Sequence, residues 1–319
     1  MFIQEATKPG ELNGSTPSVE LGTSSIHDAY LMEFEINATN ETGSSVTPTI
    51  ADFLGAINQI KIQSDNSKDH YALTGMDVAR RNAMFSPMGI ESRVIDKTFS
   101  AVADDGTVSA KFVLTLDEGD IVALQHNNIT MKVEMASTIK TDFPITSYTV
   151  KPTVIEKIPQ TEQDIIGTYG ENFEYALEPK VYATTKTLSN TTEYTGFLEV
   201  PTGALLRGAM LNWTSAPKQW GVVQIVPSRT EISRMNWLTS QVKDQRRFGT
   251  QLASNTVYFD YDSEWTLNGL GKDGRTFNRG DYMFAALPNN ADTTLRMVSY
   301  EQMFPAGAGD ILNAGKRFV

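Results

Sequence analysis

The sequence predicts an all-β fold of two tandem eight-stranded jelly-roll β-sandwiches, each with a short inserted helix. Three observations lead to this prediction. Short runs of alternating apolar and polar residues, typical of half-buried strands, recur along the 319-residue chain. A helix-like segment with an Arg-Arg pair occurs once in each half. The length and strand spacing of each half suit an eight-stranded sandwich, for which a jelly roll is the natural candidate.

The composition indicates a globular protein and excludes several kinds of site. Hydrophobic residues make up 40% of the chain and charged residues 20%, which is not the composition of a disordered chain. The formal net charge of -11 is poorly suited to binding a phosphate backbone, so we expect no specific nucleic acid partner. The chain has no cysteine, which rules out disulfides, thiolate nucleophiles and cysteine-based zinc sites. We expect neither a secretory signal nor a membrane-spanning run of about 20 apolar residues.

The first half begins with an expected arm and then an expected strand. Residues 1–25 are rich in Gly, Ser, Thr and Pro and lack periodicity, so we predict an extended or flexible arm. Residues 29–37, AYLMEFEIN, alternate and predict a strand. The side chains expected on its apolar face are Tyr30, Met32, Phe34 and Ile36.

Further elements complete an expected first jelly roll over residues 26–158. Residues 57–65 alternate again, and residues 77–85, DVARRNAMF, belong to a short amphipathic helix. Residues 104–106, Asp-Asp-Gly, indicate a turn between two strands. The polar, irregular residues 159–172 are interpreted as a linker.

The second half, residues 173–305, is expected to repeat this plan. Residues 193–201 and 220–228 indicate strands. Residues 230–248 indicate an amphipathic helix whose apolar positions are Ile232, Met235, Leu238 and Val242. The Gly- and Ala-rich residues 306–319 are expected to form a loosely held C-terminal tail.

Spacing along the chain supports an internal duplication. Four pairs of landmarks are separated by nearly the same number of positions and follow the same order. These pairs are Phe34 with Phe197, Ile62 with Ile225, Arg81 with Arg247, and Thr130 with Thr294. A repeated strand could match by chance, but a repeated helix with the same Arg pair favours duplication.

The search for catalytic chemistry gives no candidate. His27, His70 and His126 show no metal-binding spacing and are interpreted as isolated surface or loop residues. No Gly-x-Ser-x-Gly elbow is present. We therefore expect no catalytic residue, no metal site and no cofactor. Three short stretches match functional motifs, but we favour a solvated strand or loop for each of them. The motifs are a calcium site at Asp260, Asp262 and Glu264, a nucleotide-binding fingerprint at 269–274, and an integrin-binding tripeptide at 279–281.

The Arg pairs and the tryptophans each allow two interpretations. Arg80, Arg81, Arg246 and Arg247 lie near the ends of the two expected helices, where the helix dipole favours positive charge. They are also possible subunit contacts, paired with acidic residues of a neighbouring copy. All the tryptophans, Trp213, Trp220, Trp237 and Trp265, fall in the second half, where they indicate either a buried interface or ordinary core packing.

Two consecutive jelly-roll-like halves with an arm, a tail and no catalytic cluster resemble a known group. The chain looks like the double jelly-roll major capsid proteins of the tectivirus, corticovirus and adenovirus lineage. In size it is similar to the coat proteins of small lipid-containing icosahedral phages, and a lipid-containing phage that infects Flavobacterium is a candidate source. The resemblance is one of architecture over nearly the whole chain, and no functional residue is carried over from it.

The resemblance implies a structural protein rather than an enzyme. Three copies would form a homotrimer of pseudo-hexagonal outline that contacts neighbouring trimers in the capsid shell of a virion. Minor capsid proteins and an internal lipid membrane are further implied partners. Two alternatives remain open: a tandem-sandwich glycan hydrolase with a pair of carboxylates in a cleft, and a carbohydrate- or receptor-binding module with an exposed aromatic platform.

Overall fold

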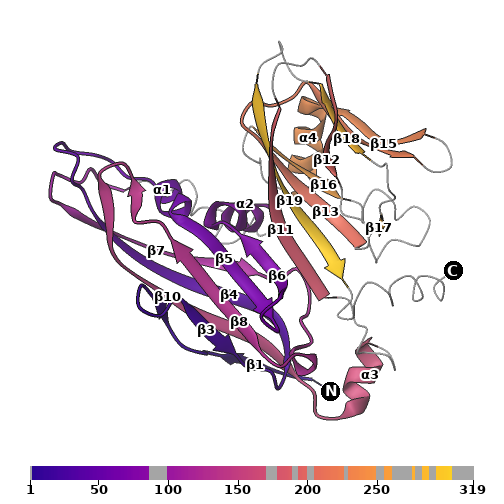
Figure 1. The fold of residues 1–319 in the computed structure, drawn as a ribbon, viewed down its shortest axis with the longest axis horizontal. Coiled ribbons are helices and arrows are strands. Elements are labelled where there is room, and N and C mark those ends of the chain that lie inside the picture. Colours follow the sequence, from indigo (N-terminus) through magenta and orange to yellow (C-terminus); the bar gives the residue numbers. More distant parts are fainter. Residues whose placement is uncertain are drawn as a thin grey trace. The chain divides into compact units, whose positions relative to one another are not determined.

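The protein folds as two units built mainly from β-strands, Met1–Pro179 and Lys180–Val319. Figure 1 shows the chain. The computed structural model describes residues 2–85, 99–169, 178–188, 193–199, 205–225, 229–248, 255–260, 275–276, 282–286 and 292–303. Within these ranges, none of the helices has both the length and the apolar character needed to cross a membrane.

The first unit contains two antiparallel sheets. One has the strand order β1-β10-β4-β7 and the other contains β6-β5-β8-β3. In the first of these sheets Phe34 lies opposite Val150 on one side and Phe112 on the other. The strands are β1 (Ile3–Thr7), β3 (Ser18–Leu21), β4 (Ile26–Thr39), β5 (Ile57–Ser64), β6 (Lys68–Leu73), β7 (Thr107–Leu116), β8 (Ile129–Met135) and β10 (Phe143–Ile158), with the short β2 (Leu12–Asn13) and β9 (Thr138–Lys140) added to β10.

The second unit also contains two sheets. One contains β16-β13-β19-β11 and the other is β12-β18-β14-β15. Most of β11 belongs to this unit, but its first two residues precede the boundary. The strands are β11 (Glu178–Leu188), β12 (Glu193–Glu199), β13 (Leu205–Trp213), β14 (Gln219–Ile225), β15 (Arg229–Asn236), β16 (Thr256–Asp260), β18 (Tyr282–Ala286) and β19 (Thr293–Met303), with the short β17 (Arg275–Thr276) added to β13.

The two units have the same strand connectivity. If the eight main strands that the described residues provide in each unit are counted in chain order, the sheets read 1-8-3-6 and 2-7-4-5 in both. A helix stands between the fifth and sixth strands each time: α2 (Gly75–Phe85) and α4 (Trp237–Phe248). This is the connectivity of an eight-stranded jelly roll. The predicted fold, two tandem jelly rolls each with an inserted helix, is confirmed.

The register of the duplication differs from the one inferred from spacing. Ile62 and Ile225 do lie in equivalent strands, β5 and β14, and the Arg pairs lie in equivalent helices. Phe34 lies in the third strand of its unit, however, whereas Phe197 lies in the second strand of the other. Thr130 and Thr294 are likewise in non-equivalent strands, β8 and β19. These two pairings were wrong, because an alternating pattern does not distinguish one strand from the next.

Two segments expected outside the sandwiches contain regular structure. Residues 1–25 contribute β1, β2 and β3, of which β1 pairs with β10 and β3 pairs with β8. The first and second strands of the first jelly roll therefore come from the segment expected to form an arm. The expected linker, 159–172, includes the helix α3 (Glu162–Tyr169). The expected tail lies outside the described residues.

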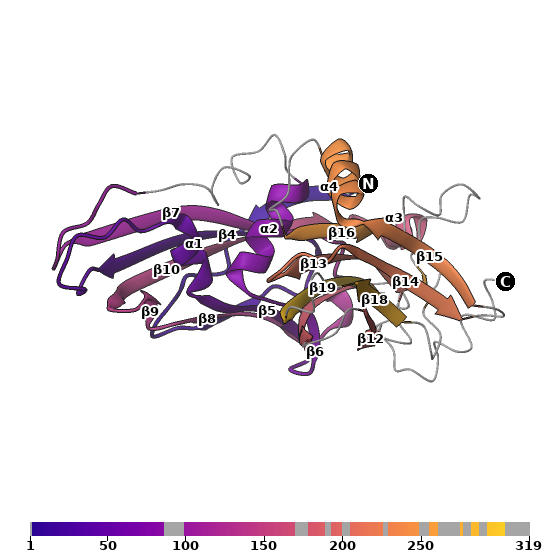
Figure 2. The same cartoon turned by 90° about the horizontal axis from the view of Figure 1, so that it is seen from above.

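The core of the first unit lies between its two sheets, which form separate layers in Figure 2. The predicted apolar face of β4 is confirmed, since Tyr30, Met32, Phe34 and Ile36 are each at most 1% exposed. Phe34 stacks on Phe112 of β7 with ring centroids 5.3 Å apart. The other layer contributes Ile60, Ile62, Met131 and Val133, all fully buried. Burial of such side chains stabilises the fold by about 1.5–3 kcal/mol each.

Helix α2 begins at a capping box and packs closely on its neighbours. The Thr74 hydroxyl accepts a hydrogen bond from the Asp77 amide, and the Asp77 carboxylate accepts one from the Thr74 amide at 3.0 Å. Gly75 follows directly. A Cβ atom there would lie 2.7 Å from Cβ of Ile57 and 2.8 Å from the carbonyl oxygen of Leu54. Leu54 belongs to the short helix α1 (Ile50–Gly55).

Replacing Gly75 by alanine is expected to lower the free energy of unfolding by about 1–3 kcal/mol, because backbone and core atoms must shift. The matched control is Gly55→Ala, where a Cβ would meet nothing within 4 Å. That substitution is expected to be neutral or slightly stabilising. Urea denaturation of both variants tests the close packing, and equal effects at the two positions would contradict it.

Candidate functional site

All three histidines are buried in the first unit. His27 and His70 are 0% exposed and His126 is 8% exposed. The interpretation of isolated surface or loop histidines was therefore wrong. His27 lies in β4, His70 in β6, and His126 directly after the short 3-10 helix η2 (Ala123–Gln125). His70 and His126 lie side by side although they are far apart in the sequence, which spacing along the chain does not reveal.

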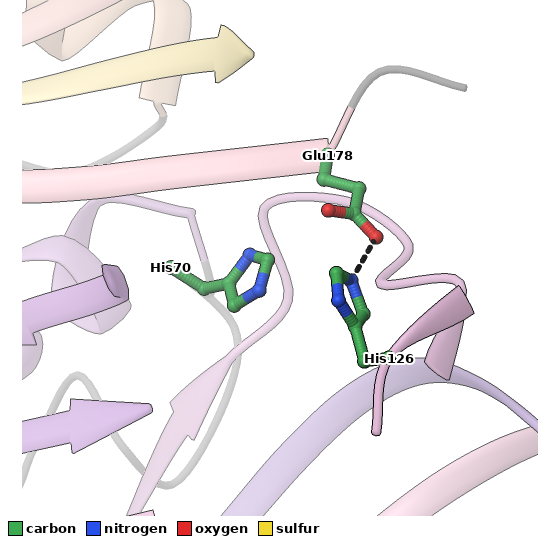
Figure 3. A group of neighbouring side chains, drawn as sticks. All are labelled: His70, His126 and Glu178. Atoms are coloured by element: carbon green, nitrogen blue, oxygen red, sulfur yellow. Dashed lines mark hydrogen bonds and ion pairs between the residues drawn. The ribbon is translucent and has the colours of Figure 1, made fainter. Parts of the chain in front are cut away.

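His126 stands between two carboxylates. Its Nδ1 is 2.9 Å from Oδ2 of Asp65, and its Nε2 is 2.9 Å from Oε1 of Glu178. Asp65 lies in the turn between β5 and β6 and has a φ of 51°, in the left-handed region where Asp is tolerated. Glu178 is the first residue of β11 and is fully buried. Figure 3 shows Glu178 directed at the His126 ring, with His70 alongside.

Lys68 and a backbone amide complete the surroundings of Glu178. The Lys68 ammonium forms an ion pair with Oε2 of Glu178. The amide of Val122 donates a hydrogen bond to Oε1 of the same carboxylate at 3.2 Å. Asp65, His126, Glu178 and Lys68, here called the Glu178 cluster, therefore alternate negative and positive groups when His126 carries a proton.

Burial and the contacts within this cluster shift the pKa values of His126, Glu178 and Asp65. Burial opposes the charge on His126, but hydrogen bonds to Glu178 and Asp65 outweigh it and raise the pKa of His126 above 6.5. Burial would raise the pKa of Glu178, but His126, His70 and Lys68 hold it below its usual value. The pKa of Asp65 is lowered as well, because its contacts with His126 and Asn127 outweigh the effect of burial.

His70 is a neutral neighbour of the cluster. Its ring centroid is 5.6 Å from that of His126. Nδ1 lies 3.2 Å from the Pro179 carbonyl oxygen and Nε2 lies 2.9 Å from the Ser64 hydroxyl. A tautomer protonated at Nδ1 satisfies both contacts, since it donates to the carbonyl and accepts from the hydroxyl. Burial lowers the pKa of His70 to about 4.

The donor atoms of His70, His126 and Glu178 lie within 4.8 Å of one another, which raises the question of a metal ion. Two histidines and one carboxylate can form a zinc site. Here, however, both His70 nitrogens have hydrogen-bond partners and the Lys68 ammonium already neutralises Glu178. His126 is held by carboxylates at both nitrogens. These contacts favour a proton on His126 over a metal ion among the three residues.

A second buried polar group surrounds His27. Its Nδ1 lies 2.9 Å from the Tyr30 hydroxyl, and its Nε2 lies 3.5 Å from Glu156. Ser25 donates a hydrogen bond to the same carboxylate at 2.8 Å. Burial lowers the pKa of His27, although Glu156 acts in the opposite direction. His27 therefore stays neutral at neutral pH.

The four arginines proposed as subunit contacts have different surroundings. Arg81 is 7% exposed and forms ion pairs with Asp117 and with Glu118, the latter at 2.6 Å. Arg80 is half-buried and Arg246 is exposed. The side chain of Arg247 lies outside the described residues. Arg81 is thus engaged inside the first unit, and any contact with another subunit would fall to the other three.

The remaining sequence candidates are only partly placed. Trp213 and Trp220 are 0% and 1% exposed and belong to the core of the second unit, and Trp237 is half-buried. The structure therefore favours core packing for the first two. Trp265, the carboxylates at Asp262 and Glu264, and residues 269–274 and 279–281 lie outside the described residues, as does the side chain of Asp260.

Comparison with known proteins identifies the fold. The chain is similar to the major capsid protein of Sulfolobus turreted icosahedral virus, with a TM-score of 0.75 and 12% identity over 96% of this chain and 97% of that chain. It is also similar to VP54 of PBCV-1, with a TM-score of 0.61 and 9% identity over 96% and 97%. For the major capsid protein P2 of bacteriophage PM2 the TM-score is 0.54, with 9% identity over 95% and 98%.

Sequence comparison adds nothing to this, since no family model matches the chain and no curated protein is significantly similar to it. At these levels of identity the similarity is one of fold. The chain has the double jelly-roll fold of these capsid proteins, in agreement with the strand connectivity of its two units.

Proposed function

We propose that this chain is a major capsid protein whose copies associate as pseudo-hexameric trimers and tile the icosahedral shell of a virion. The observation that carries the proposal is the repeat of one jelly-roll connectivity in both units. Three copies present six similar sandwiches, which suits a hexagonal lattice of trimers. The similarity to major capsid proteins over almost the whole chain supports the same role.

In this role the protein is a building block and not an enzyme, and it requires no cofactor. Its main partners are further copies of itself. Minor capsid proteins and an internal lipid membrane are additional partners in the proposal, and no specific nucleic acid is among them. The binding-module alternative needs an exposed aromatic platform, but two of the tryptophans that the structure describes lie in the core.

Helix α4 supplies a surface for self-association. Leu238 and Val242, one turn apart, are 72% and 58% exposed, although their spacing predicts that they face the core. The helix is turned the other way because its polar residues have buried partners. Ser240 accepts a hydrogen bond from the Trp220 indole at 2.8 Å, and Asp244 accepts one from the Tyr258 amide at 2.7 Å.

We infer that a second copy of this chain covers the exposed stripe formed by Leu238 and Val242 on α4. The stripe continues to the exposed Arg246, and Lys243 and Arg247 add positive charge to the same helix. Such a helix complements a chain of net charge -11. Arg80, Arg246 and Arg247 are accordingly proposed to pair with acidic residues of neighbouring copies.

Light scattering of the purified chain at micromolar concentration tests the proposal. The expected result is a stable species of three times the chain mass of 35.2 kDa, or a larger shell-like assembly. Leu238→Ser with Val242→Ser should weaken association by about 100-fold or more, because each lost apolar contact is worth about 1.5–3 kcal/mol.

The matched control is Thr239→Ser with Gln245→Ser, two exposed polar positions on the same helix. This control imposes a comparable change in helix propensity and should leave the oligomer unchanged. A wild-type chain that remains a monomer over a wide concentration range would contradict the capsid proposal. An oligomer that both variants form equally well would contradict only the role of α4.

A further inference from the structure

We propose that the Glu178 cluster is a proton-operated clamp in the first unit: His126 ties Asp65 to Glu178 while both of its nitrogens carry protons, and it releases one carboxylate when a proton leaves. The clamp lies within one unit, so the proposal does not rest on the capsid function. It joins three segments: the turn between β5 and β6, the end of η2, and the start of β11.

The geometry requires a doubly protonated ring. Each ring nitrogen of His126 is 2.9 Å from a carboxylate oxygen, and an ionised carboxylate can only accept a hydrogen bond. A neutral imidazole has a single N–H group, so one of its nitrogens would direct a lone pair at a carboxylate. While both carboxylates are ionised, only the imidazolium form donates a hydrogen bond to Asp65 and to Glu178 together.

The charges around the ring balance in that form. Asp65 and Glu178 are negative, and His126 and Lys68 are positive. Within the described residues, further titratable groups nearby are His70, His27 and Tyr30, with Glu156 beyond His27. His70 and His27 have lowered pKa values and are neutral at neutral pH. Among the three histidines, His126 is thus the one that holds a proton above pH 6.5.

Losing the clamp affects the start of β11. Glu178 precedes Pro179, the last residue of the first unit, and receives contacts from Lys68, His126 and the Val122 amide. When His126 becomes neutral, one of its two carboxylate contacts turns from attractive to repulsive. The chain leading out of the first unit is then held less firmly.

The direction of the pH dependence follows from the shifts. The pKa of His126 is raised in the folded state, so its contribution to stability is fully present below 6.5 and is lost as pH rises through the folded value. The pKa values of Asp65 and Glu178 are lowered, so their contributions are lost as pH falls through their folded values. His70 acts in the opposite sense to His126, because its lowered pKa makes protonation unfavourable to folding as pH falls from 6.5 towards 4.

The first test is NMR titration of the full chain with ring-labelled histidine. The chain has three histidines, so three signals are expected, and His27→Gln, His70→Gln and His126→Gln assign them. We expect His126 to titrate above 6.5, His27 below 6.5 and His70 near 4. Asp65→Asn should move the titration of His126 to lower pH and leave that of His70 nearly unchanged. A His126 signal that titrates at or below 6.5 and ignores this substitution would overturn the clamp.

The second test compares unfolding across pH and does not depend on NMR. The stability difference between wild type and His126→Gln should be largest between the carboxylate pKa values and 6.5, and should shrink above it. The matched control, His70→Gln, should show the opposite trend below 6.5. Zinc chloride provides the remaining arm. If micromolar Zn²⁺ stabilises the wild type but neither histidine variant, the cluster binds a metal ion and the clamp proposal fails.

Discussion

Replacing Arg81 by methionine is expected to lower the free energy of unfolding of the first unit by about 3–5 kcal/mol. The side chains of Arg81 and Glu118 are each 8% exposed and lie 2.6 Å apart. Methionine fills much of the same space but leaves the Glu118 carboxylate buried without its cation. Breaking one side of a buried ion pair is costly because the remaining charge keeps its desolvation penalty.

The loss should depend on pH in a defined direction. Burial raises the pKa of Glu118, and Arg81 partly counteracts this. Without Arg81 the pKa of Glu118 rises further. A group whose pKa is higher in the folded than in the unfolded state stabilises the fold at low pH, and this contribution to stability is lost as pH increases. The deficit of Arg81→Met should therefore be larger at pH 7 than at pH 4. Urea denaturation at both pH values measures it.

Two controls make the result specific to burial. Lys111→Met breaks an ion pair with Glu35 at 3.0 Å in which the lysine side chain is 63% exposed, and should cost less than about 1 kcal/mol. Combining Arg81→Met with Glu118→Gln should recover part of the loss, because no charge is then left buried. If Arg81→Met costs no more than Lys111→Met, Arg81 is not an internal ion-pair residue and its role as a subunit contact regains support.

Replacing Trp220 by alanine is expected to destabilise the second unit by about 3–5 kcal/mol. The side chain is 1% exposed, and its indole N–H donates to the Ser240 hydroxyl at 2.8 Å, which ties β14 to α4. The cost combines the lost apolar burial with the cavity that remains. Thermal or urea denaturation followed by circular dichroism measures the effect.

Ser240→Ala is the matched control for Trp220. It removes the hydrogen-bond acceptor but leaves the ring in place, so it should cost about 1–3 kcal/mol, less than the removal of the ring. Light scattering of Trp220→Ala distinguishes the two interpretations of the tryptophans. A variant with unchanged stability but weaker self-association would place Trp220 at an interface and contradict its assignment to the core.

The two equivalent helices show how one connectivity can serve different purposes. In the first unit α2 buries Arg81 in an ion pair and packs Val78, Ala79 and Met84 inward. In the second unit α4 turns Ser240 and Asp244 inward and leaves Leu238 and Val242 exposed. The first arrangement stabilises its own unit. The second leaves apolar surface for another molecule, which is the difference expected if α4, and not α2, offers apolar side chains to a neighbouring copy.

The class of fold and several local elements could be predicted from periodicity and length alone. The face of β4 that carries Tyr30 and Phe34, and the presence of a helix at each Arg pair, could be predicted because strand and helix periodicity are properties of neighbouring residues. The helix predicted over residues 230–248 was wrong in its first part, because Arg229–Asn236 form β15 and α4 begins at Trp237. The eight-stranded plan was predicted from the length and strand spacing of each half. These periodic patterns depend on neighbouring residues, and the elements they predict are present in the fold.

The contacts between distant elements are evident only from the three-dimensional fold. The strand β1 pairs with β10, although the two lie near opposite ends of the first unit's sequence. The sandwich therefore includes a segment whose Gly, Ser, Thr and Pro content is typical of a flexible arm. The fold turns α4 so that Ser240 reaches the buried Trp220 indole and Leu238 faces outward. It also assembles Asp65, His126 and Glu178 from three segments. Charge pairing acts through space, and no local pattern records which distant carboxylate a histidine will meet.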